Sequence, residues 1–328
     1  MLIFICVTWL SWRSFVVEEE DSSYFKDHTN IYVLVYIVKV TCYLARLPFS
    51  FEVFLGFFFY NPFATEIKTQ NDYNKETTNH TLLFRVVTRG LFPDLVRNTL
   101  KRNMEMIENV GIKHYMFEVV TNSKIGLNPY KRLREVVIPI NYVTPKGSLY
   151  KARSLQYCLE PHINKLKDND WIIHLDEETL LTKDIIHGII QFTRENEFQF
   201  GQAVTKFADE DIINWVTTFG DIHRVGADYG HLRNCLKCFN ITFDNWRGNF
   251  LVSKLAAERE ITFDFGPNGS ITEDCTFGMV AASKGYTFGF VNGEVWEKSP
   301  FTVYDFIKQR QRWIKGVILS LTIQRNTI

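Results

Sequence analysis

Residues 171–178 read WIIHLDEE, a short apolar run that ends in acids. An uninterrupted run of this length is typical of a strand buried on both faces of a parallel sheet. Asp176 and Glu178 follow at its carboxyl end, and they point the same way because side chains alternate in extended chain. Two such carboxylates can hold a hard divalent cation, whereas in the alternative interpretation they cap the next helix or stay solvated.

The residues before this run alternate between strand and helix patterns. Apolar strands are predicted at 82–88 and 115–121, with a weaker one at 136–142, and helices are predicted from Pro93 onward and at 151–159. Strands separated by helices favour an α/β fold whose parallel sheet is covered on both faces. Ligands of such sheets bind beyond the carboxyl ends of the strands, so functional residues are expected there.

A second acidic motif lies in residues 266–275, GPNGSITEDC, where a glycine-rich loop leads into a helix. Thr272 is the expected N-cap, with Glu273 and Asp274 in the first turn, where acids favour the helix dipole. Helix capping alone explains these acids. The functional interpretation makes Asp274 a general base that removes a proton from an acceptor hydroxyl as its oxygen attacks a sugar.

The third motif is QRQRW at residues 309–313. On a helix, Gln309, Arg312 and Trp313 share one face. The forked donors of arginine suit phosphate, and an indole face stacks well against a sugar ring. The alternative is a basic amphipathic helix lying on a membrane surface, and both interpretations can hold together.

Composition limits the class of protein. The chain has 328 residues, of which 46% are hydrophobic, and this excludes a disordered chain. Lys plus Arg and Asp plus Glu both total 37, so the net charge is zero, and nucleic acid is not an expected partner. An aromatic share of 15% indicates a large core, an interface or a membrane boundary.

The first 63 residues are expected to meet a membrane. Apolar stretches at 1–17, 31–47 and 49–63 precede a polar stretch at 64–80 that is typical of a linker. We expect one or two membrane-inserted helices and an interfacial aromatic segment within 1–63. The alternative is an apolar helical layer packed on a soluble domain.

Taken in order, the D-x-E (176–178), T-E-D (272–274) and Q-x-x-R-W (309–313) motifs resemble the family 2 inverting glycosyltransferases with a GT-A catalytic domain. The longer stretches FRVVTRGLFPDLVRNTLKRN (84–103) and SITEDCTFGMVAASKGYTFGFVNGEVWEKSPFTVYDFIKQRQRWIKG (270–316) are similar to the invertebrate Egghead-type β-1,4-mannosyltransferases. The resemblance covers roughly residues 30 to 320. It implies a GT-A fold with a Rossmann-like mixed sheet and N-terminal membrane helices.

The resemblance also implies an activity. Members of this family are multi-pass membrane enzymes that transfer mannose from GDP-mannose to the glucose of glucosylceramide in glycosphingolipid synthesis. A Golgi or endoplasmic-reticulum membrane is then expected, with the catalytic domain facing the cytosol. Two alternatives remain: another membrane family 2 glycosyltransferase, making a polysaccharide or another glycolipid, or a catalytically inactive relative that binds nucleotide or lipid.

On the donor side, the resemblance implies that Asp176 and Glu178 lie at the diphosphate and hold a divalent cation, Mn²⁺ or Mg²⁺. Lys151 and Arg312 would contact the diphosphate. Asn122 stands where the family has an aspartate that helps to bind the nucleotide, so it would contribute a hydrogen bond without charge. A different strand register would be needed for Glu118 to take its place.

On the acceptor side, the resemblance makes Asp274 the catalytic base and places Trp313 and Gln309 at the acceptor sugar. The GT-A domain is expected over residues 81–299, followed by an interfacial amphipathic helix over 300–328. Because the family continues into further membrane helices beyond this point, the chain is expected to be a fragment or a shortened form.

Overall fold

The computed structural model describes residues 51, 80–127, 132–207, 212–242 and 246–327, with side chains to residue 321. Apart from Phe51 and His80, the predicted membrane segments (1–63) and linker (64–80) lie outside these described residues. Within the described ranges, every helix is too short or too polar to cross a bilayer.

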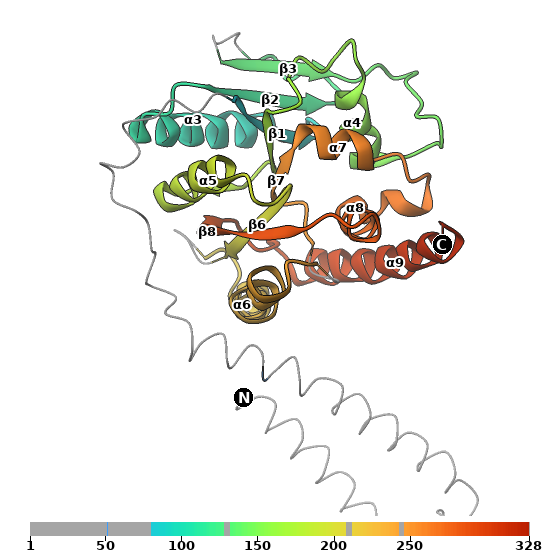
Figure 1. Ribbon diagram of the computed structural model, residues 1–328. Helices are drawn as coiled ribbons and strands as arrows, with labels where there is room; N and C mark the ends of the chain where they lie inside the picture. The colour runs from blue at the N-terminus through green and yellow to red at the C-terminus, as the bar shows by residue number, and fades with distance from the viewer. Residues whose placement is uncertain (1–50, 52–79, 128–131, 208–211, 243–245, 328) are drawn as a thin grey trace, which may run out of the picture. The chain divides into compact units, whose positions relative to one another are not determined.

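The described strands form one eight-stranded sheet in the order β3-β2-β1-β4-β7-β6-β8-β5 (Figure 1). Several of these strands are apolar runs buried along almost their whole length, which suits the interior of a layered α/β fold. Their bounds are β1 (Leu82–Thr88), β2 (Tyr115–Thr121), β3 (Leu133–Val137), β4 (Trp171–Leu175), β5 (Leu180–Leu181), β6 (Phe200–Lys206), β7 (Phe250–Lys254) and β8 (Phe288–Trp296).

Strand direction changes in the middle of the sheet. Strands β1 to β4 pair in parallel, as predicted, but β7 is antiparallel to both β4 and β6. The parallel sheet that the strand pattern favoured is therefore found for β1 to β4 but not for β7, and the sheet is mixed, as the resemblance implied. A buried apolar run such as β7 fits either direction, so its residue pattern does not reveal which way it runs.

The third strand is also displaced from its prediction. Strand β3 ends at Val137, whereas the pattern placed a strand over 136–142. Ile138 still donates its backbone N–H to the Thr121 carbonyl, at 2.9 Å, but Pro139 has no N–H to continue the ladder. Tyr142 instead closes a turn onto the Pro139 carbonyl, at 3.0 Å.

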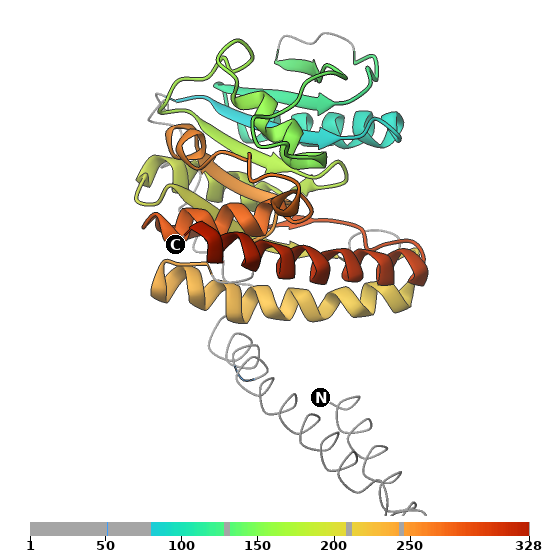
Figure 2. The ribbon, with the colours of Figure 1, turned by 90° about the vertical axis from the view of Figure 1, so that its right-hand side faces the viewer.

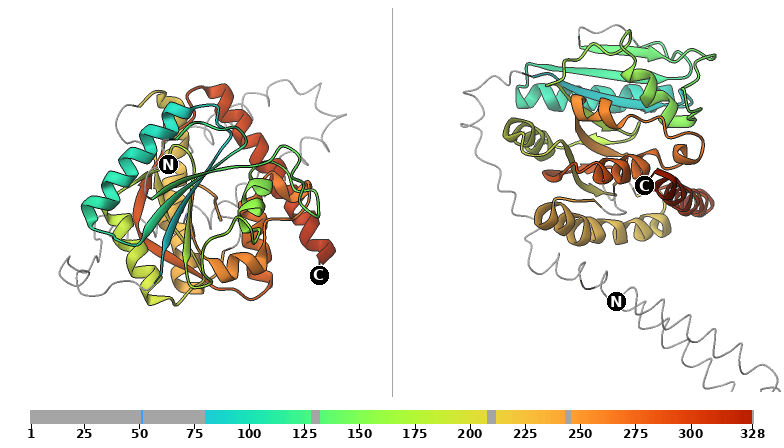
Figure 3. Two further views of the ribbon diagram at one scale, coloured as in Figure 1. Left: turned by 90° about the horizontal axis from the view of Figure 1, so that it is seen from above. Right: turned by 45° about the vertical axis from the view of Figure 1, so that its right-hand side comes forward.

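Helices cover both faces of the sheet, as the view from above makes clear (Figure 3). One face carries α3 (Pro93–Val110) and α5 (Lys183–Glu195), and the other carries α4 (Tyr150–Leu159), α7 (Leu255–Ile261) and α8 (Glu273–Ser283). Two further helices, α6 (Trp215–Ala227) and α9 (Val303–Thr327), contact each other beside these layers (Figure 2). Short π- and 3₁₀-helical turns complete the described residues: η3 (Asp228–Leu232), η4 (Cys235–Phe239) and η5 (Asn268–Ser270).

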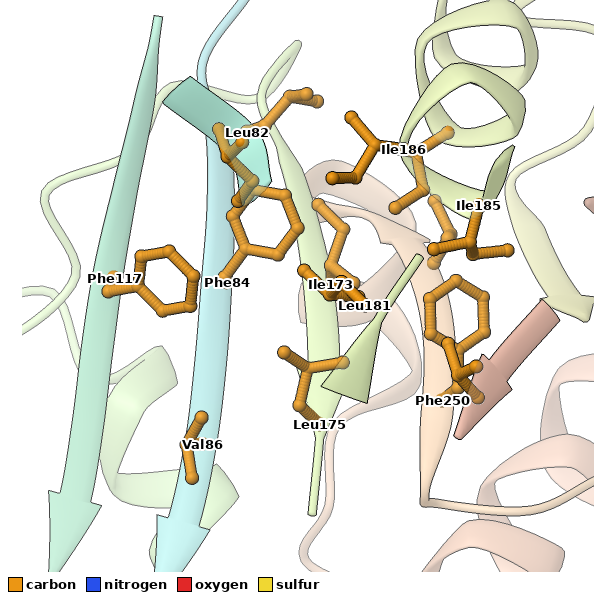
Figure 4. Packing of buried hydrophobic residues seen from close by; sticks show 14 of the residues in the cluster. Leu82, Phe84, Val86, Phe117, Ile173, Leu175, Leu181, Ile185, Ile186 and Phe250 are labelled. Atoms are coloured by element: carbon orange, nitrogen blue, oxygen red, sulfur yellow. The ribbon is translucent and has the colours of Figure 1, made fainter. Parts of the chain in front are cut away.

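Alternation along β1 explains how one strand serves both layers. Leu82, Phe84 and Val86 enter the core under α3 and α5, whereas Leu83 enters the core under α4 and α7. Phe84 stacks on Phe117 of β2, with ring centroids 5.0 Å apart (Figure 4). Burial on both faces fixes the strand firmly, so the side chains that follow its carboxyl end have a rigid support.

Candidate active site

A cavity of about 1220 Å³ lies where β1, β2 and β4 end. The parallel register of these strands brings their carboxyl ends to one edge of the sheet, so Thr88, Asn122 and Asp176 all line this cavity. Segments from α4, α8 and α9 close its other sides. All of the residues predicted for the site line it: Asn122, Lys151, Asp176, Glu178, Asp274, Gln309, Arg312 and Trp313.

Lys151 joins the two acidic motifs across the cavity. Its Nζ lies 2.5 Å from Asp176 Oδ1 and 4.0 Å from Glu273 Oε1, and it donates to the Gly248 carbonyl at 3.0 Å. Burial alone would lower the pKa of Lys151, but the carboxylates of Asp176 and Glu273 raise it above its ordinary value. The lysine is therefore held as a cation between acids that lie 97 positions apart (273 − 176 = 97) in the chain.

The glycine-rich loop sets the start of the helix that carries Lys151. Ser270 of this loop accepts a hydrogen bond from the Leu149 backbone N–H at 2.8 Å and donates to the Gly266 carbonyl at 2.6 Å. Tyr150 then turns the chain with a φ of 52°, a left-handed conformation that few aromatic residues adopt. Strained backbone of this kind persists where surrounding contacts fix it, which is common at functional sites.

Asp274 lies in the first turn of α8 with both carboxylate oxygens bound to backbone. Its Oδ2 accepts from the Gly248 N–H at 2.6 Å, and its Oδ1 accepts from the Cys275 N–H at 2.8 Å. Burial raises the pKa of Asp274, although these hydrogen bonds and the Lys151 charge oppose the rise. A Cβ on residue 248 would lie 3.2 Å from Asp274 Oδ2 and 3.3 Å from Lys151 Nζ, so glycine allows this close approach.

Thr272 occupies the N-cap position, as predicted, but its hydroxyl does not cap the helix. The hydroxyl instead lies 3.3 Å from Ser320 Oγ of α9, and Ser320 also lies 2.7 Å from Thr276 Oγ1. The start of α8, with Asp274, is thus tied to the helix that carries Trp313.

Asp176 and Glu178 lie among acids whose charges would favour a bound divalent cation. Burial and the charges of Asp176 and Glu297 raise the pKa of Glu178 well above its ordinary value. Burial, followed by the Asp176 charge, also raises the pKa of Glu297 to about 7. A bound cation would relieve this repulsion, so the carboxylates fit one. Among the described residues, however, no group of three or more metal-binding side chains converges, so a ligand such as a diphosphate would have to complete the coordination.

Asn122 follows β2 with an exposed side chain, and Arg153 Nη1 lies 3.5 Å from its Oδ1. Glu118 does not replace it. That carboxylate is fully buried within the sheet, where it accepts from Arg85 Nε at 2.6 Å and pairs with Arg134. The strand register therefore leaves Asn122 at the cavity and Glu118 away from it.

On α9, the motif residues all line the cavity, but they are placed differently. Trp313 is half-buried, whereas Arg312 is exposed. Arg310, which was not predicted as a site residue, lies over the Trp313 ring at 4.1 Å and donates to Gln309 Oε1 at 2.9 Å. Arg312, by contrast, lines the cavity with an exposed side chain.

Further residues line the cavity that no sequence motif marks as site residues. Glu297 follows the carboxyl end of β8, Arg224 comes from α6, and Arg247 and Asn249 come just before the antiparallel strand β7. Glu297 follows a strand much as Asp176 does, which is the one pattern that could have marked it.

The mixed sheet, the acids at the end of β4 and the acid-bearing start of α8 are features of a glycosyltransferase of the GT-A type. Residues 171–328 match the family model for glycosyl transferase family group 2. The fold resembles that of the mannosyltransferase PcManGT from Pyrobaculum calidifontis in complex with GDP-Man and Mn²⁺, with a TM-score of 0.51 and 12% identity over 78% of this chain and 70% of that one.

Comparison with curated proteins narrows this class. The chain is 41% identical to the β-1,4-mannosyltransferase egh of Drosophila melanogaster over 97% of its own length and 70% of that protein. It is 43% identical to the β-1,4-mannosyltransferase bre-3 of Caenorhabditis elegans over 88% of its own length and 63% of that protein. The chain belongs to the Egghead-type β-1,4-mannosyltransferase family of glycosyltransferases, and it spans about two thirds of the length of these relatives.

Proposed function

We propose that this chain transfers mannose from GDP-mannose to the glucose of glucosylceramide, forming a β-1,4 linkage with inversion at the anomeric carbon. The observation that carries the proposal is the meeting of Asp176, Asp274 and Trp313 in one cavity. The names of the relatives support mannosyl transfer, and GDP-Man in the PcManGT structure supports the donor.

The proposed reaction is a single displacement. Asp274 removes the proton from the acceptor hydroxyl while that oxygen bonds to the anomeric carbon, and the bond to the diphosphate breaks so that GDP leaves with the electron pair. Each Asp274 oxygen accepts one backbone N–H and keeps a lone pair for the proton. Burial raises the pKa of Asp274, which makes the carboxylate a stronger base.

The donor diphosphate would lie between Lys151 and the exposed side chain of Arg312, which both line the cavity. Asp176 and Glu178 would hold a divalent cation, Mn²⁺ or Mg²⁺, which when bound stabilises negative charge on the leaving diphosphate. The Mn²⁺ of PcManGT supports this assignment. Trp313 and Gln309 would receive the acceptor sugar.

A membrane is the proposed location, because the acceptor is a lipid. Two neighbouring helices, α6 and α9, expose apolar side chains at helical spacing: Trp215, Val216, Phe219, Ile307, Ile314 and Ile318. Such faces suit the interfacial region of a bilayer. We propose that segments within residues 1–63 insert in a Golgi or endoplasmic-reticulum membrane, with the catalytic domain facing the cytosol.

One assay tests the function directly. Membranes from cells expressing the chain are given GDP-mannose, or UDP-sugars in parallel, with a panel of lipid acceptors, and products are read by mass spectrometry with linkage analysis. We expect mannosyl-glucosylceramide to form with GDP-mannose as the donor and not with the UDP-sugars. Product from UDP-sugars instead would favour another family 2 transferase, and GDP binding without any product would favour an inactive relative.

Asp176→Asn is expected to remove most of the stimulation of GDP binding by Mn²⁺, because a neutral amide is a far poorer cation ligand than a carboxylate. Calorimetry with and without Mn²⁺ measures the change, for which we expect about a tenfold loss of affinity in the presence of the metal. Asp168→Asn is the matched control, since Asp168 precedes the amino end of the same strand and pairs with exposed Arg259 at 2.5 Å. Equal metal dependence in all three proteins would contradict the cation site.

Asn122→Asp is expected to keep or raise transfer activity, since it restores the acid that the family carries at this position. The added charge lies near Arg153 and at the exposed edge of the cavity, where its desolvation cost is small. Initial rates at several GDP-mannose concentrations give the measurement. A large loss of activity would show that Asn122 does not occupy the nucleotide-binding position.

A further inference from the structure

Helices α6 and α9 contact each other, and residues of both line the cavity (Figure 2). Asn214, the N-cap of α6, donates from Nδ2 to the Phe301 carbonyl at 3.1 Å. A Cβ on Gly220 would lie 2.7 Å from the ring of Phe306, so glycine lets the two helices approach here. This contact brings Asp221, the next residue of α6, against the inner face of α9.

Asp221 neutralises two arginines from different helices. Its Oδ1 accepts from Arg224 Nη1 of α6, at 3.4 Å, and from Arg310 Nη2 of α9. The carboxylate is 0% exposed, whereas the two arginine side chains remain partly exposed, at 17% and 23%. A buried carboxylate that accepts charge-assisted hydrogen bonds from two sides restricts both partners more tightly than an exposed pair would.

Both arginines lie against the indole of Trp313. The guanidinium carbon of Arg310 is 4.1 Å from the ring centroid, and that of Arg224 is 4.8 Å from it. Arg310 also lies 4.2 Å from the Phe306 ring, and Arg224 lies 4.7 Å from the Phe207 ring. These distances are within the range of cation–π attraction, so the orientation of the indole depends on where the two guanidinium groups are held.

We propose that Asp221 is a positioning residue for the acceptor platform: by holding Arg224 and Arg310, it fixes the orientation of Trp313 in the cavity. This inference rests on the proposed function, in which the indole receives the acceptor sugar. The Asp221 side chain is itself fully buried, and it acts through the two arginines.

The surrounding charges make the position of Arg310 depend strongly on Asp221. Arg247 pairs with Asp228 at 2.5 Å and adds a third guanidinium near the other two. The charges of Asp228 and Glu297 also act on Arg224. Without the Asp221 charge, Arg310 would face Arg224 and Arg247 with no carboxylate of its own, and its side chain is expected to leave the indole.

The kinetic test uses the full chain in membranes with GDP-mannose and glucosylceramide. Asp221→Asn is expected to raise the KM for glucosylceramide about tenfold while leaving GDP affinity and the KM for GDP-mannose unchanged. Arg310→Lys, which keeps the charge but not the planar stacking group, is expected to act in the same direction, and Asp168→Asn is expected to change nothing.

A double-mutant cycle separates positioning from general destabilisation. If Asp221 acts through the indole, Asp221→Asn changes the acceptor KM less than twofold when Trp313 is already alanine. If the two effects multiply instead, or if the donor KM rises equally with the acceptor KM, the proposal is wrong.

A spectroscopic experiment tests the orientation of Trp313 without measuring transfer activity. The full chain is labelled with 5-fluorotryptophan in detergent micelles, and the Trp313 resonance is identified by its loss in Trp313→Phe. Asp221→Asn and Arg310→Lys are expected to shift this resonance and to leave those of the other tryptophans outside α6 in place. An unshifted Trp313 signal overturns the inference, whereas absence of transfer in the unmodified chain would count against the proposed function alone.

Discussion

Asp274→Asn is expected to lower the rate of mannosyl transfer by about a thousandfold, within the range that general-base catalysis contributes. The amide can still accept a hydrogen bond from the Gly248 N–H, which the carboxylate accepts at 2.6 Å, so the loop should keep its place. It cannot take the proton of an acceptor hydroxyl. The initial rate of transfer should therefore be almost lost, whereas the affinity for GDP, measured by calorimetry, should be nearly unchanged.

The neighbouring acid provides a matched control. Burial, with the Asp274 charge beside it, raises the pKa of Glu273 to about 8, which shifts this side chain toward its protonated form. Glutamine resembles a protonated glutamic acid in shape and charge, so Glu273→Gln is expected to keep most of the activity at pH 7. A thousandfold loss in Glu273→Gln with full activity in Asp274→Asn would reverse the assignment of the base.

The positions of the acids were predictable because they depend on local rules. Side chains that follow buried parallel strands gather at one edge of a sheet, and Asp176 lies at that edge. The start of α8 after a glycine-rich loop could be predicted equally well, and Asp274 lies in its first turn, as expected. The direction of β7 could not be predicted, because its apolar run fits either a parallel or an antiparallel strand.

The arrangement of the arginines on α9 could not be predicted in the same way. Arg310 and Arg312 occupy one short motif, and either suits a phosphate by its chemistry. Arg310 is turned inward by Asp221 of α6, 89 positions earlier in the chain, while Arg312 stays exposed. A contact between segments so far apart depends on the packing of two helices, which the periodicity of either helix alone does not contain. The same holds for Glu297, whose neighbours are set by the order of the strands.

Lys151→Met is expected to lower transfer at pH 7 by about a hundredfold, the effect typical of losing one electrostatic group at a reacting centre. The ammonium group lowers the pKa of both Glu273 and Asp274, against the burial that raises them. Without it, the pKa of Asp274 rises further, and less of the basic carboxylate remains at neutral pH. The acidic limb of the pH–rate profile should therefore move to higher pH, and part of the lost rate should return as the pH is raised.

This shift distinguishes two roles for the lysine. If Lys151 only contacted the donor diphosphate, its removal would lower the rate by the same factor at every pH and leave the limb in place. Lys151→Arg keeps the positive charge near Asp176 and is expected to retain the pH profile even if its rate falls. Lys101→Met, which removes an exposed lysine 4.0 Å from Glu105 on α3, should change neither rate nor profile. An unmoved acidic limb in Lys151→Met would mean that the charge of Lys151 does not govern the protonation of Asp274.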